Sequence, residues 1–527
     1  MNQTSVKFTK LFVLLFLVSL SLGFATAETK LIPREVLFGN PVKASLQISP
    51  NGEYLSYRAP SEKNVMNVWV QKIGSKEGKM VTNDTHRGIR AYGWTYNNDL
   101  VYLQDNGGDE NFHMYLVNLK TNIVRDLTPF QGIKAQNFIF DKKHPNEFLV
   151  GLNLRNKRVF DMYRVSLKTG AIELDTKNPG MIMGWSTDHD FKIRVASGID
   201  MRTGGSVIKV RDAMDKPWRD LVKAPFGENI GFRGFTPDGK NIYITTSIGS
   251  DTSRLVEIDF KTGKEVKTII SNKKCDVGGV ITDDDSHKIQ AVSFNYMKQE
   301  FVFFDKALEA EYLYLKKQHP GEMMLGSEDL KKQYRVVVYT NDDSPVKYYL
   351  YHKKTKKLEY LFTNKPALEK YKLAKMQPVL IKTRDKLKMV SYMTLPIVKK
   401  AKKLPFVLLV HGGPWARDNW GYSPLVQMLA NRGYGVLQVN FRGSTGFGKK
   451  FLNAGNKEWG IGKMQHDLTD AVKWLVKKGY ADSKKVCIIG GSYGGYATLA
   501  GLTFTPDLYS CGVDIVGPSN LFTLLNS

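Results

Sequence analysis

The chain is poor in cysteine and, beyond its first residues, has no long apolar run. Its three cysteines, Cys275, Cys487 and Cys511, are too few for a framework of paired disulfides. The nine histidines are scattered and show no His-x-x-x-His spacing, and no Cys-x-x-Cys occurs, so we expect neither a metal nor another cofactor. No stretch after residue 27 approaches 18 apolar residues, which predicts no membrane span in the mature chain.

Residues 1–27 have the pattern of a secretory signal peptide. Lys7 and Lys10 give a basic start, residues 11–22 are almost wholly apolar, and Ala25-Thr-Ala27 matches the A-x-A cleavage pattern. The apolar segment is too short for a comfortable membrane span. We therefore expect the mature chain to begin at Glu28 and to be exported, either to a periplasm or to the outside of the cell.

Acidic residues are scarce relative to basic ones. The chain has 76 lysines and arginines against 51 aspartates and glutamates, a formal net charge of +25. This charge would attract an anionic partner such as nucleic acid or a membrane surface, or it is simply a lysine-rich solvated surface. The lysines occur in short scattered runs, such as residues 399–403, and no nucleic-acid-binding motif accompanies them. The solvated surface is favoured, and we expect no nucleic-acid partner.

Residues 28–375 are built on a repeat. A polar turn such as Ser49-Pro-Asn-Gly-Glu53 or Thr236-Pro-Asp-Gly-Lys240 returns every 45 to 50 residues, with six clear copies and a weaker seventh at Glu328. Strands with alternating apolar residues follow these turns, for example Tyr54-Leu-Ser-Tyr57. A unit of this length with four strands is typical of a propeller blade, whereas a β-sandwich would not keep the spacing. We predict an all-β propeller of seven blades.

One predicted blade contains the polar loop Asp105-Asn-Gly-Gly-Asp-Glu-Asn111. If the loop faces a second domain, Asp109 and Glu110 would receive the amino group of a substrate. Alternatively, the loop only closes a hairpin and its acids face water. The turn-like composition favours the structural role, and substrate binding stays open.

From residue 376 the pattern changes to strands that alternate with helices. In chain order we expect a hairpin over 378–394, a strand over 406–410, a helix over 425–431, a strand over 435–440, a helix over 460–478 and a strand over 486–489. Wholly apolar strands separated by helices indicate a doubly wound parallel sheet covered on both faces. Residues 376–527 are therefore predicted to form an α/β domain.

The last of these strands runs into Gly490-Gly-Ser-Tyr-Gly494, which has the form of a nucleophile elbow. In such an elbow a strand, a tight turn with an exposed serine, and a helix follow one another, and glycines allow the close backbone contacts. Glycine-flanked serines also occur in plain turns, but the apolar strand before and the helix formers after favour the elbow. Ser492 is the candidate nucleophile, and the Tyr493 amide is the candidate donor to an oxyanion.

A second motif, His411-Gly-Gly-Pro414, follows the first apolar strand. In a hydrolase of this architecture this loop supplies another oxyanion-binding amide, which we assign to Gly412 or Gly413. His411 is either a catalytic base or a structural hydrogen-bonding residue, and its place in a glycine loop before the nucleophile favours the structural role.

The loop of residues 441–448 carries Arg442, which we expect to pin the loop to a carboxylate or to contact the substrate. A phosphate-binding loop is the competing interpretation of its glycines. The Gly-Lys-Ser/Thr ending that such a loop requires is absent.

These motifs together resemble the prolyl oligopeptidase family of serine peptidases, with the acylaminoacyl peptidase and dipeptidyl peptidase branches most similar. The resemblance rests on HGGP at 411, NFRGSTGFG at 440, GYAD at 479 and GGSYGGYA at 490. It implies a propeller capping an α/β-hydrolase domain, peptide substrates, Ser492 as the nucleophile, and Tyr493 and the HGGP loop as oxyanion donors. Some members place a helping tyrosine where Phe447 stands here. Whether the chain forms a homo-oligomer stays open.

The chain lacks a histidine after Ser492. The triad order in this fold is Ser, then Asp or Glu, then His, but only Asp507 and Asp514 follow, and Asp514 comes too soon after the elbow. The part from residue 404 onward is also shorter than the roughly 200–250 residues of such a domain. We expect a C-terminally truncated member that lacks the triad Asp and His and has little or no activity. A purposely inactive member is the alternative.

The leading hypothesis is an exported serine peptidase that hydrolyses short peptides through an acyl-enzyme on Ser492, with access gated by the propeller. A rival is a non-catalytic, peptide-binding propeller with a degenerate hydrolase tail, which the missing histidine favours. An esterase or lipase would share the elbow, but such enzymes rarely carry a long N-terminal propeller.

Overall fold

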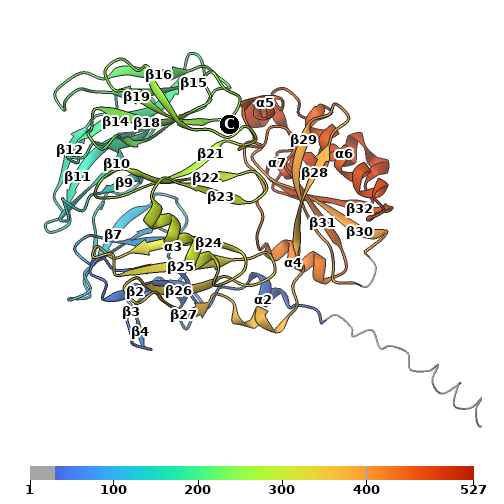
Figure 1. The fold of residues 1–527 in the computed structure, drawn as a ribbon, viewed down its shortest axis with the longest axis horizontal. Coiled ribbons are helices and arrows are strands. Elements are labelled where there is room, and N and C mark those ends of the chain that lie inside the picture. Colours follow the sequence, from blue (N-terminus) through green and yellow to red (C-terminus); the bar gives the residue numbers. More distant parts are fainter. Residues whose placement is uncertain (1–29, 399–400, 527) are drawn as a thin grey trace, which may run out of the picture.

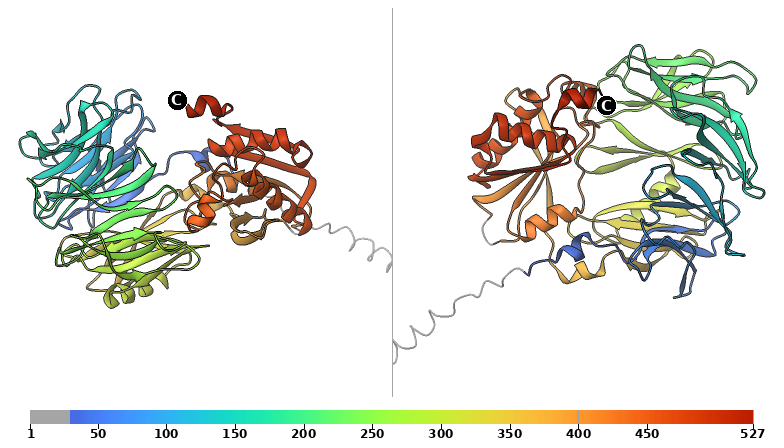
Figure 2. Two further views of the ribbon diagram at one scale, coloured as in Figure 1. Left: turned by 90° about the horizontal axis from the view of Figure 1, so that it is seen from above. Right: turned by 180° about the vertical axis from the view of Figure 1, so that it is seen from behind.

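The computed structural model describes residues 30–398 and 401–526, so the predicted signal peptide, residues 1–27, lies outside the described residues. The chain forms a β-propeller followed by an α/β domain (Figure 1). Seen from above, the α/β domain lies against one end of the propeller (Figure 2).

Seven antiparallel sheets make the propeller. Blade one is β1 (Ala44–Ile48), β2 (Tyr54–Pro60), β3 (Met66–Lys72) and β4 (Gly78–Met80), and blade two is β5 (Ala91–Trp94), β6 (Leu100–Gln104), β7 (His113–Val117) and β8 (Val124–Asp126). Blade three is β9 (Ala135–Phe140), β10 (Glu147–Asn156), β11 (Val159–Ser166) and β12 (Ile172–Thr176), and blade four is β13 (Ile182–Thr187), β14 (Ile193–Asp200), β15 (Gly205–Val210) and β16 (Arg219–Ala224).

The remaining blades complete the ring. Blade five is β17 (Ile230–Phe235), β18 (Asn241–Thr246), β19 (Arg254–Asp259) and β20 (Glu265–Ile270), and blade six is β21 (Val277–Thr282), β22 (Ile289–Asn295) and β23 (Gln299–Phe303). Blade seven is β24 (Glu322–Glu328), β25 (Tyr334–Thr340), β26 (Lys347–His352) and β27 (Lys357–Thr363). The predicted seven-bladed propeller is confirmed.

The recurring polar turns join the first and second strands of the blades. In two of them the hydroxyl that opens the turn accepts the amide of the returning strand: Tyr54 N to Ser49 Oγ at 2.9 Å, and Asn241 N to Thr236 Oγ1 at 3.0 Å. These side chains close the turn where the backbone alone cannot. In blades three, four, six and seven an aspartate (Asp141, Asp188, Asp283 or Asp329) accepts the turn amides instead. The need for a short polar side chain at this place in each blade explains the sequence period.

Blade seven packs on blade one to close the ring. Leu46 and Leu55 of blade one share a buried cluster with Val336 and Leu350 of blade seven. Apolar packing between sheets therefore holds the ring, since the strands of each blade come from one continuous segment.

A helix not predicted from the sequence, α3 (Lys306–Lys316), follows β23 and precedes blade seven. Asp305 caps it by accepting the amides of Ala307 and Leu308. Its buried Tyr312 and Leu315 pack with aromatic side chains of blade six and strands of blade seven. Blade six, with three strands among the described residues, is thus flanked by a helix.

The α/β domain has a six-stranded sheet with the order β28-β29-β31-β30-β32-β33. The strands are β28 (Met376–Lys382), β29 (Lys388–Thr394), β30 (Leu404–Val410), β31 (Gly435–Val439), β32 (Ala481–Gly491) and β33 (Cys511–Ile515). The last four in chain order are parallel, and the hairpin β28–β29 adds an antiparallel edge. The predicted hydrolase architecture is confirmed, with β32 longer than the apolar run that indicated it.

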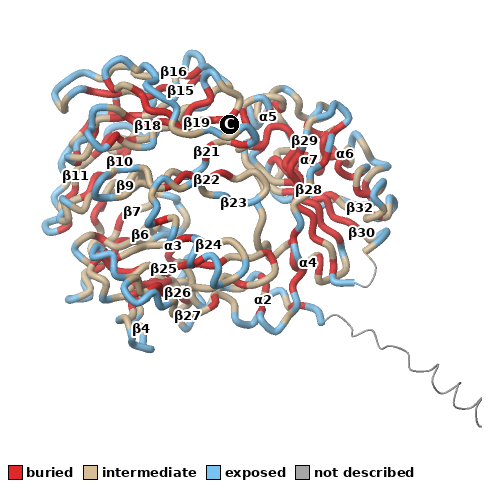
Figure 3. The backbone as a smooth tube through the Cα atoms, in the orientation of Figure 1, coloured by how far each residue is buried: buried red, intermediate tan, exposed pale blue. Residues whose placement is uncertain are grey.

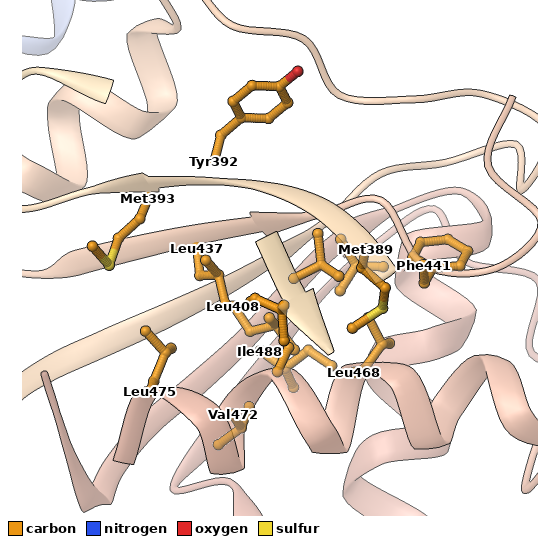
Figure 4. Packing of buried hydrophobic residues seen from close by; sticks show 14 of the residues in the cluster. Met389, Tyr392, Met393, Leu408, Leu437, Phe441, Leu468, Val472, Leu475 and Ile488 are labelled. Atoms are coloured by element: carbon orange, nitrogen blue, oxygen red, sulfur yellow. The ribbon is translucent and has the colours of Figure 1, made fainter. Parts of the chain in front are cut away.

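Helices α4 (Pro424–Asn431), α5 (Lys449–Asn453), α6 (Lys463–Lys477) and α7 (Tyr493–Phe504) pack around the sheet, whereas α8 (Leu521–Leu525) has no buried residue. Helix α2 (Arg34–Phe38) packs near α4, and short 3-10 turns lie at Pro366–Lys370 and Pro506–Leu508. Leu408, Leu437 and Ile488 of the central strands meet Leu468 and Val472 of α6 (Figure 4). Burial concentrates along these strands and helices (Figure 3). No helix within the described part of the chain is both long and apolar enough to cross a membrane.

The α/β domain contacts one end of the propeller. Arg417 donates to the backbone oxygens of Asn295 and Tyr296, at 2.6 and 3.0 Å. Tyr392, whose ring lies on the opposite side of β29 from Met389 and Met393 (Figure 4), donates to the Met297 oxygen at 2.9 Å. Lys449 pairs with Glu228 of the propeller. The α/β domain therefore faces the end that carries the connections between second and third strands.

Candidate active site

Ser492 lies at the sharp turn between β32 and α7. Its backbone has φ of 55° and ψ of −121°, a strained conformation for a residue with a side chain. Its amide donates to the Ile515 oxygen at 2.9 Å, and its carbonyl accepts from Tyr496 at 3.1 Å. The residue is exposed, so the turn presents the hydroxyl outward at the end of the parallel sheet.

Two glycines of the turn are required by space. A Cβ at Gly490 would lie 2.2 Å from the carbonyl group of Gly494, and a Cβ at Gly494 would lie 2.1 Å from the Val410 oxygen. Neither gap admits a side chain. The turn therefore folds on itself and presses against the end of β30, where the HGGP loop begins.

Gly412 is the HGGP residue that reaches Ser492. A Cβ at Gly412 would meet the Ser492 Cβ at 3.3 Å and the Gly491 oxygen at 3.0 Å. Gly413, with φ of 115°, turns the chain away at the next residue. The two predicted oxyanion loops thus meet at Ser492.

The side chain of Tyr493 packs inward. Its ring lies 4.8 Å from that of Trp459 and 5.5 Å from that of Phe441, between centroids. As the first residue of α7, Tyr493 has an amide without an intrahelical acceptor. Its amide and the positive end of the helix are available beside Ser492.

His411 is a buried hydrogen-bonding residue of its loop. Its Nδ1 lies 2.8 Å from the Gly412 oxygen and its Nε2 lies 2.9 Å from Ser444 Oγ. The ring stacks on Phe441 with centroids 4.5 Å apart. Burial lowers the pKa of His411, which favours the neutral imidazole. Both nitrogens are engaged away from Ser492, as the structural interpretation requires.

Arg442 holds three segments of the domain together. It donates to Asp467 of α6 at 2.7 and 2.9 Å, and to Asp385 of the β28–β29 turn at 2.9 Å twice. Its side chain is 5% exposed. The geometry therefore favours pinning of the loop over contact with a substrate. Motif analysis did not find Asp385 and Asp467, which are distant in sequence from Arg442.

Phe447 is a packing residue. Arg417 lies 4.3 Å above its ring, and its ring centroid lies 5.3 Å from that of Phe451 and 6.2 Å from that of Tyr296 of the propeller. An aromatic side chain here joins the loop of Arg442 to the domain interface. It offers no hydroxyl to an oxyanion.

The loop of residues 105–111 joins β6 to β7, the second and third strands of blade two. Connections of this kind lie at the propeller end that faces the α/β domain, because antiparallel strands alternate in direction. Asp105 is buried and pairs with Arg87 at 3.2 Å. Asp109 accepts the amides of Asn106 and Asn111, and Glu110 is exposed with φ of 58°. The loop is thus ordered by its own acids, with Glu110 on its surface.

Asp514 has a local structural role in β33. Its Oδ1 accepts the Gly517 amide at 2.8 Å, and a Cβ at Gly495 would lie 2.1 Å from that oxygen. Among the described residues, no hydrogen bond reaches the Ser492 hydroxyl and no group of three or more His, Cys, Asp or Glu side chains is placed to hold a metal ion.

A serine at a strained strand-to-helix turn, on a parallel sheet that lies against a seven-bladed propeller, defines a propeller-capped α/β-hydrolase. The model of the prolyl oligopeptidase family matches residues 420–526. The chain is 45% identical over 512 residues to dipeptidyl aminopeptidase BIII of Pseudoxanthomonas mexicana, which covers 95% of this chain and 74% of that protein. It belongs to the prolyl oligopeptidase family of serine peptidases, as the motifs indicated.

A second relative and a solved structure are also similar to this chain. Dipeptidyl peptidase family member 6 of Caenorhabditis elegans is 33% identical over 547 residues, covering 96% of this chain and 73% of that protein. A puromycin-hydrolysing peptidase of Mycobacterium tuberculosis superposes with a TM-score of 0.69 at 16% identity, over 94% of this chain and 80% of that structure. This structural likeness shows the shared fold.

Proposed function

We propose that the protein is an exported peptidase that removes dipeptides from the N-termini of short peptides through an acyl-enzyme on Ser492. The observation that carries the proposal is the exposed Ser492 on a strained turn, with the backbone of Gly412 against it. The names of the two similar dipeptidyl peptidases support dipeptide release.

In the proposed reaction Ser492 Oγ attacks the peptide carbonyl and gives up its proton. The negative charge that forms on the carbonyl oxygen is stabilised by the amides of Tyr493 and of Gly412 or Gly413. The C–N bond then breaks, the amine leaves with a proton, and water hydrolyses the ester. The peptide amine is the leaving group and the acylated fragment is the dipeptide.

The proton of Ser492 needs a base. Residues 493–527 contain no histidine, and both nitrogens of His411 are engaged elsewhere. A serine without a base is a poor nucleophile at neutral pH. We therefore propose that these 527 residues alone react slowly, and that a base supplied from solution accelerates the reaction.

The free amine of a substrate would bind at the 105–111 loop. A dipeptidyl peptidase must recognise a cationic N-terminus, and an exposed carboxylate on the α/β-facing end of the propeller suits that task. Hydrogen bonds from Asn111 lower the pKa of Asp109, so this carboxylate is ionised at neutral pH. Because Asp109 is already engaged in the loop, Glu110 is the stronger candidate for the amine.

Labelling with a fluorophosphonate tests the nucleophile. With imidazole present, the probe should attach at Ser492, and Ser492→Ala should abolish the adduct in the tryptic peptide map. Binding of a peptide with a free amine, compared with its N-acetylated form, tests the amine site. Glu110→Gln should reduce the preference for the free amine about tenfold.

The second candidate function, a non-catalytic peptide-binding propeller, is favoured by the missing histidine. It predicts peptide binding with no labelling of Ser492 at any imidazole concentration. Export is tested separately, by fractionation of cells and N-terminal sequencing of the mature chain, which should begin at Glu28.

A further inference from the structure

The propeller end that faces away from the α/β domain carries the turns between first and second strands. The first strand of a blade is the innermost one, so these turns lie closest to the central axis. Several of them contact turns of blades that are not their neighbours in the ring.

Lysine–aspartate pairs join distant blades. Lys142, in the turn of blade three, pairs with Asp285, in the turn of blade six. Lys332 of blade seven pairs with Asp283 and Asp285 of blade six, each at 3.0 Å. Two blades separate blade three from blade six along the shorter way around the ring. Their turns can meet only across the axis.

Two histidines form a second contact between blades that are not neighbours in the ring. His189 of blade four and His287 of blade six stack with ring centroids 3.7 Å apart and an interplanar angle of 17°. His189 Nε2 donates to the Thr236 oxygen of blade five at 2.9 Å, and Lys143 of blade three donates to the His189 oxygen at 3.3 Å. Turns from blades three to six therefore share one contact network.

We propose that these turns form an axial plug that closes the outer mouth of the propeller channel, so that peptides reach Ser492 from the side, between the two domains. The axial plug is defined as the following residues: Lys142, Lys143, His189, Asp283, Asp285, His287 and Lys332.

Both aspartates of the axial plug pair with lysines. A backbone hydrogen bond from Ser286, together with Lys332, holds the pKa of Asp283 well below its usual range, and Asp283 and Asp285 raise the pKa of Lys332. Asp283 and Lys332 therefore stay charged across the neutral range. Partly exposed ion pairs are individually weak and screened by salt, so the closure rests on several contacts together.

The junction between the two domains contains open space. A cavity of about 490 Å³ lies at the junction of the domains, lined by Lys298, Glu322 and Asp342 of the propeller side and by Met376 and Trp420 of the α/β domain. Access at a domain junction would select peptides by width and by flexibility. This selection of peptides rests on the proposed peptidase function, whereas the closure of the outer mouth by the axial plug does not.

Cross-linking tests the closure without any need for activity. In a chain with Cys487→Ser and Cys511→Ser, the pair Lys142→Cys and Asp285→Cys is treated with a short bis-maleimide, and the linked peptides are counted by mass spectrometry. The His189–His287 stack and the Lys332–Asp283 pair remain to hold the turns. We expect the great majority of molecules to be linked.

The matched control is a pair of positions in blades three and five, which are closer in the ring than blades three and six, with one position away from the axis. Lys142→Cys with Lys261→Cys joins blade three to the outer-strand turn of blade five, and should give no intramolecular link. Absence of the 142–285 link, or equal linking of the control pair, would overturn the axial plug.

The association rate of a fluorescent short peptide then tests the access route. Linking 142 to 285 locks the outer mouth, so the rate should stay within twofold of that of the unlinked protein. A tenfold or greater fall would show that peptides pass through the axial mouth, and would overturn the inference. A protein that links as expected but binds no peptide contradicts the proposed function and leaves the axial plug supported.

Discussion

The backbone of Gly412 lies directly against Ser492, and a Cβ at position 412 would sit 3.3 Å from the Ser492 Cβ. The same Cβ would lie 3.0 Å from the Gly491 oxygen, in the backbone of the elbow. Glycine at 412 therefore allows two loops, about 80 residues apart in sequence, to meet at one hydroxyl. The positions of the assigned oxyanion donors, the amides of Tyr493 and of Gly412 or Gly413, depend on this contact.

Gly412→Ala should slow fluorophosphonate labelling of Ser492 at least tenfold, measured with imidazole present. The added methyl group forces the HGGP loop away by a few tenths of an ångström, and loss of one oxyanion donor typically costs a factor of 10²–10³. Gly180→Ala is the control, because a Cβ there meets nothing within 4 Å. Equal rates for the two variants would contradict the assignment of Gly412.

Asp467→Asn should destabilise the α/β domain by about 3 kcal/mol, because removing one partner leaves the buried Arg442 charge only partly compensated. Asp385→Asn is the matched comparison: it faces the same guanidinium, but its side chain is 45% exposed, so water replaces much of the lost interaction. The urea midpoint, followed by a probe in the α/β domain, should fall clearly more for Asp467→Asn. Equal shifts would show that burial does not determine how much each ion pair of Arg442 contributes to the stability of the domain.

His411 should make the α/β domain less stable in mild acid. Burial lowers its pKa below the ordinary value of 6.5, so below about pH 6.5 the unfolded chain binds a proton that the folded protein resists. Stability is therefore lost as the pH falls from 6.5 towards the folded pKa. Urea midpoints between pH 5 and 8 should fall less steeply in His411→Gln than in the unaltered protein. Parallel pH profiles of the urea midpoint for the two proteins would mean that the pKa of His411 does not change on folding.

The propeller repeat, the alternation of strands and helices after residue 376, and the elbow could all be predicted because each depends on local chemistry. The hydroxyl of Ser49 or Thr236 closes its turn within a few residues, and the glycines around Ser492 are demanded by contacts within the same turn. The partners of Arg442 could not be predicted, since they lie 25 and 57 residues away and only folding brings them together. Helix α3 was missed because residues 28–375 were interpreted as a repeat of strands and turns, which includes no helix.

The domain interface depends on Arg417. Arg417→Ala removes both hydrogen bonds to the backbone oxygens of Asn295 and Tyr296, and the aromatic contact with Phe447. Hydrogen exchange in residues 295–299 should then become about tenfold faster, because that turn opens locally more often. Amides of the distant blade two should be unchanged and serve as the control. Unchanged exchange in 295–299 would show that other contacts hold the domains together.

The most direct test of the central claim is the dependence of Ser492 labelling on imidazole concentration. If Ser492 is a presented nucleophile that lacks only a base, the rate of fluorophosphonate labelling rises in proportion to neutral imidazole, at least tenfold in all, and Ser492→Ala shows no labelling. A rate that does not respond to imidazole, or an adduct on a residue other than Ser492, would contradict the account.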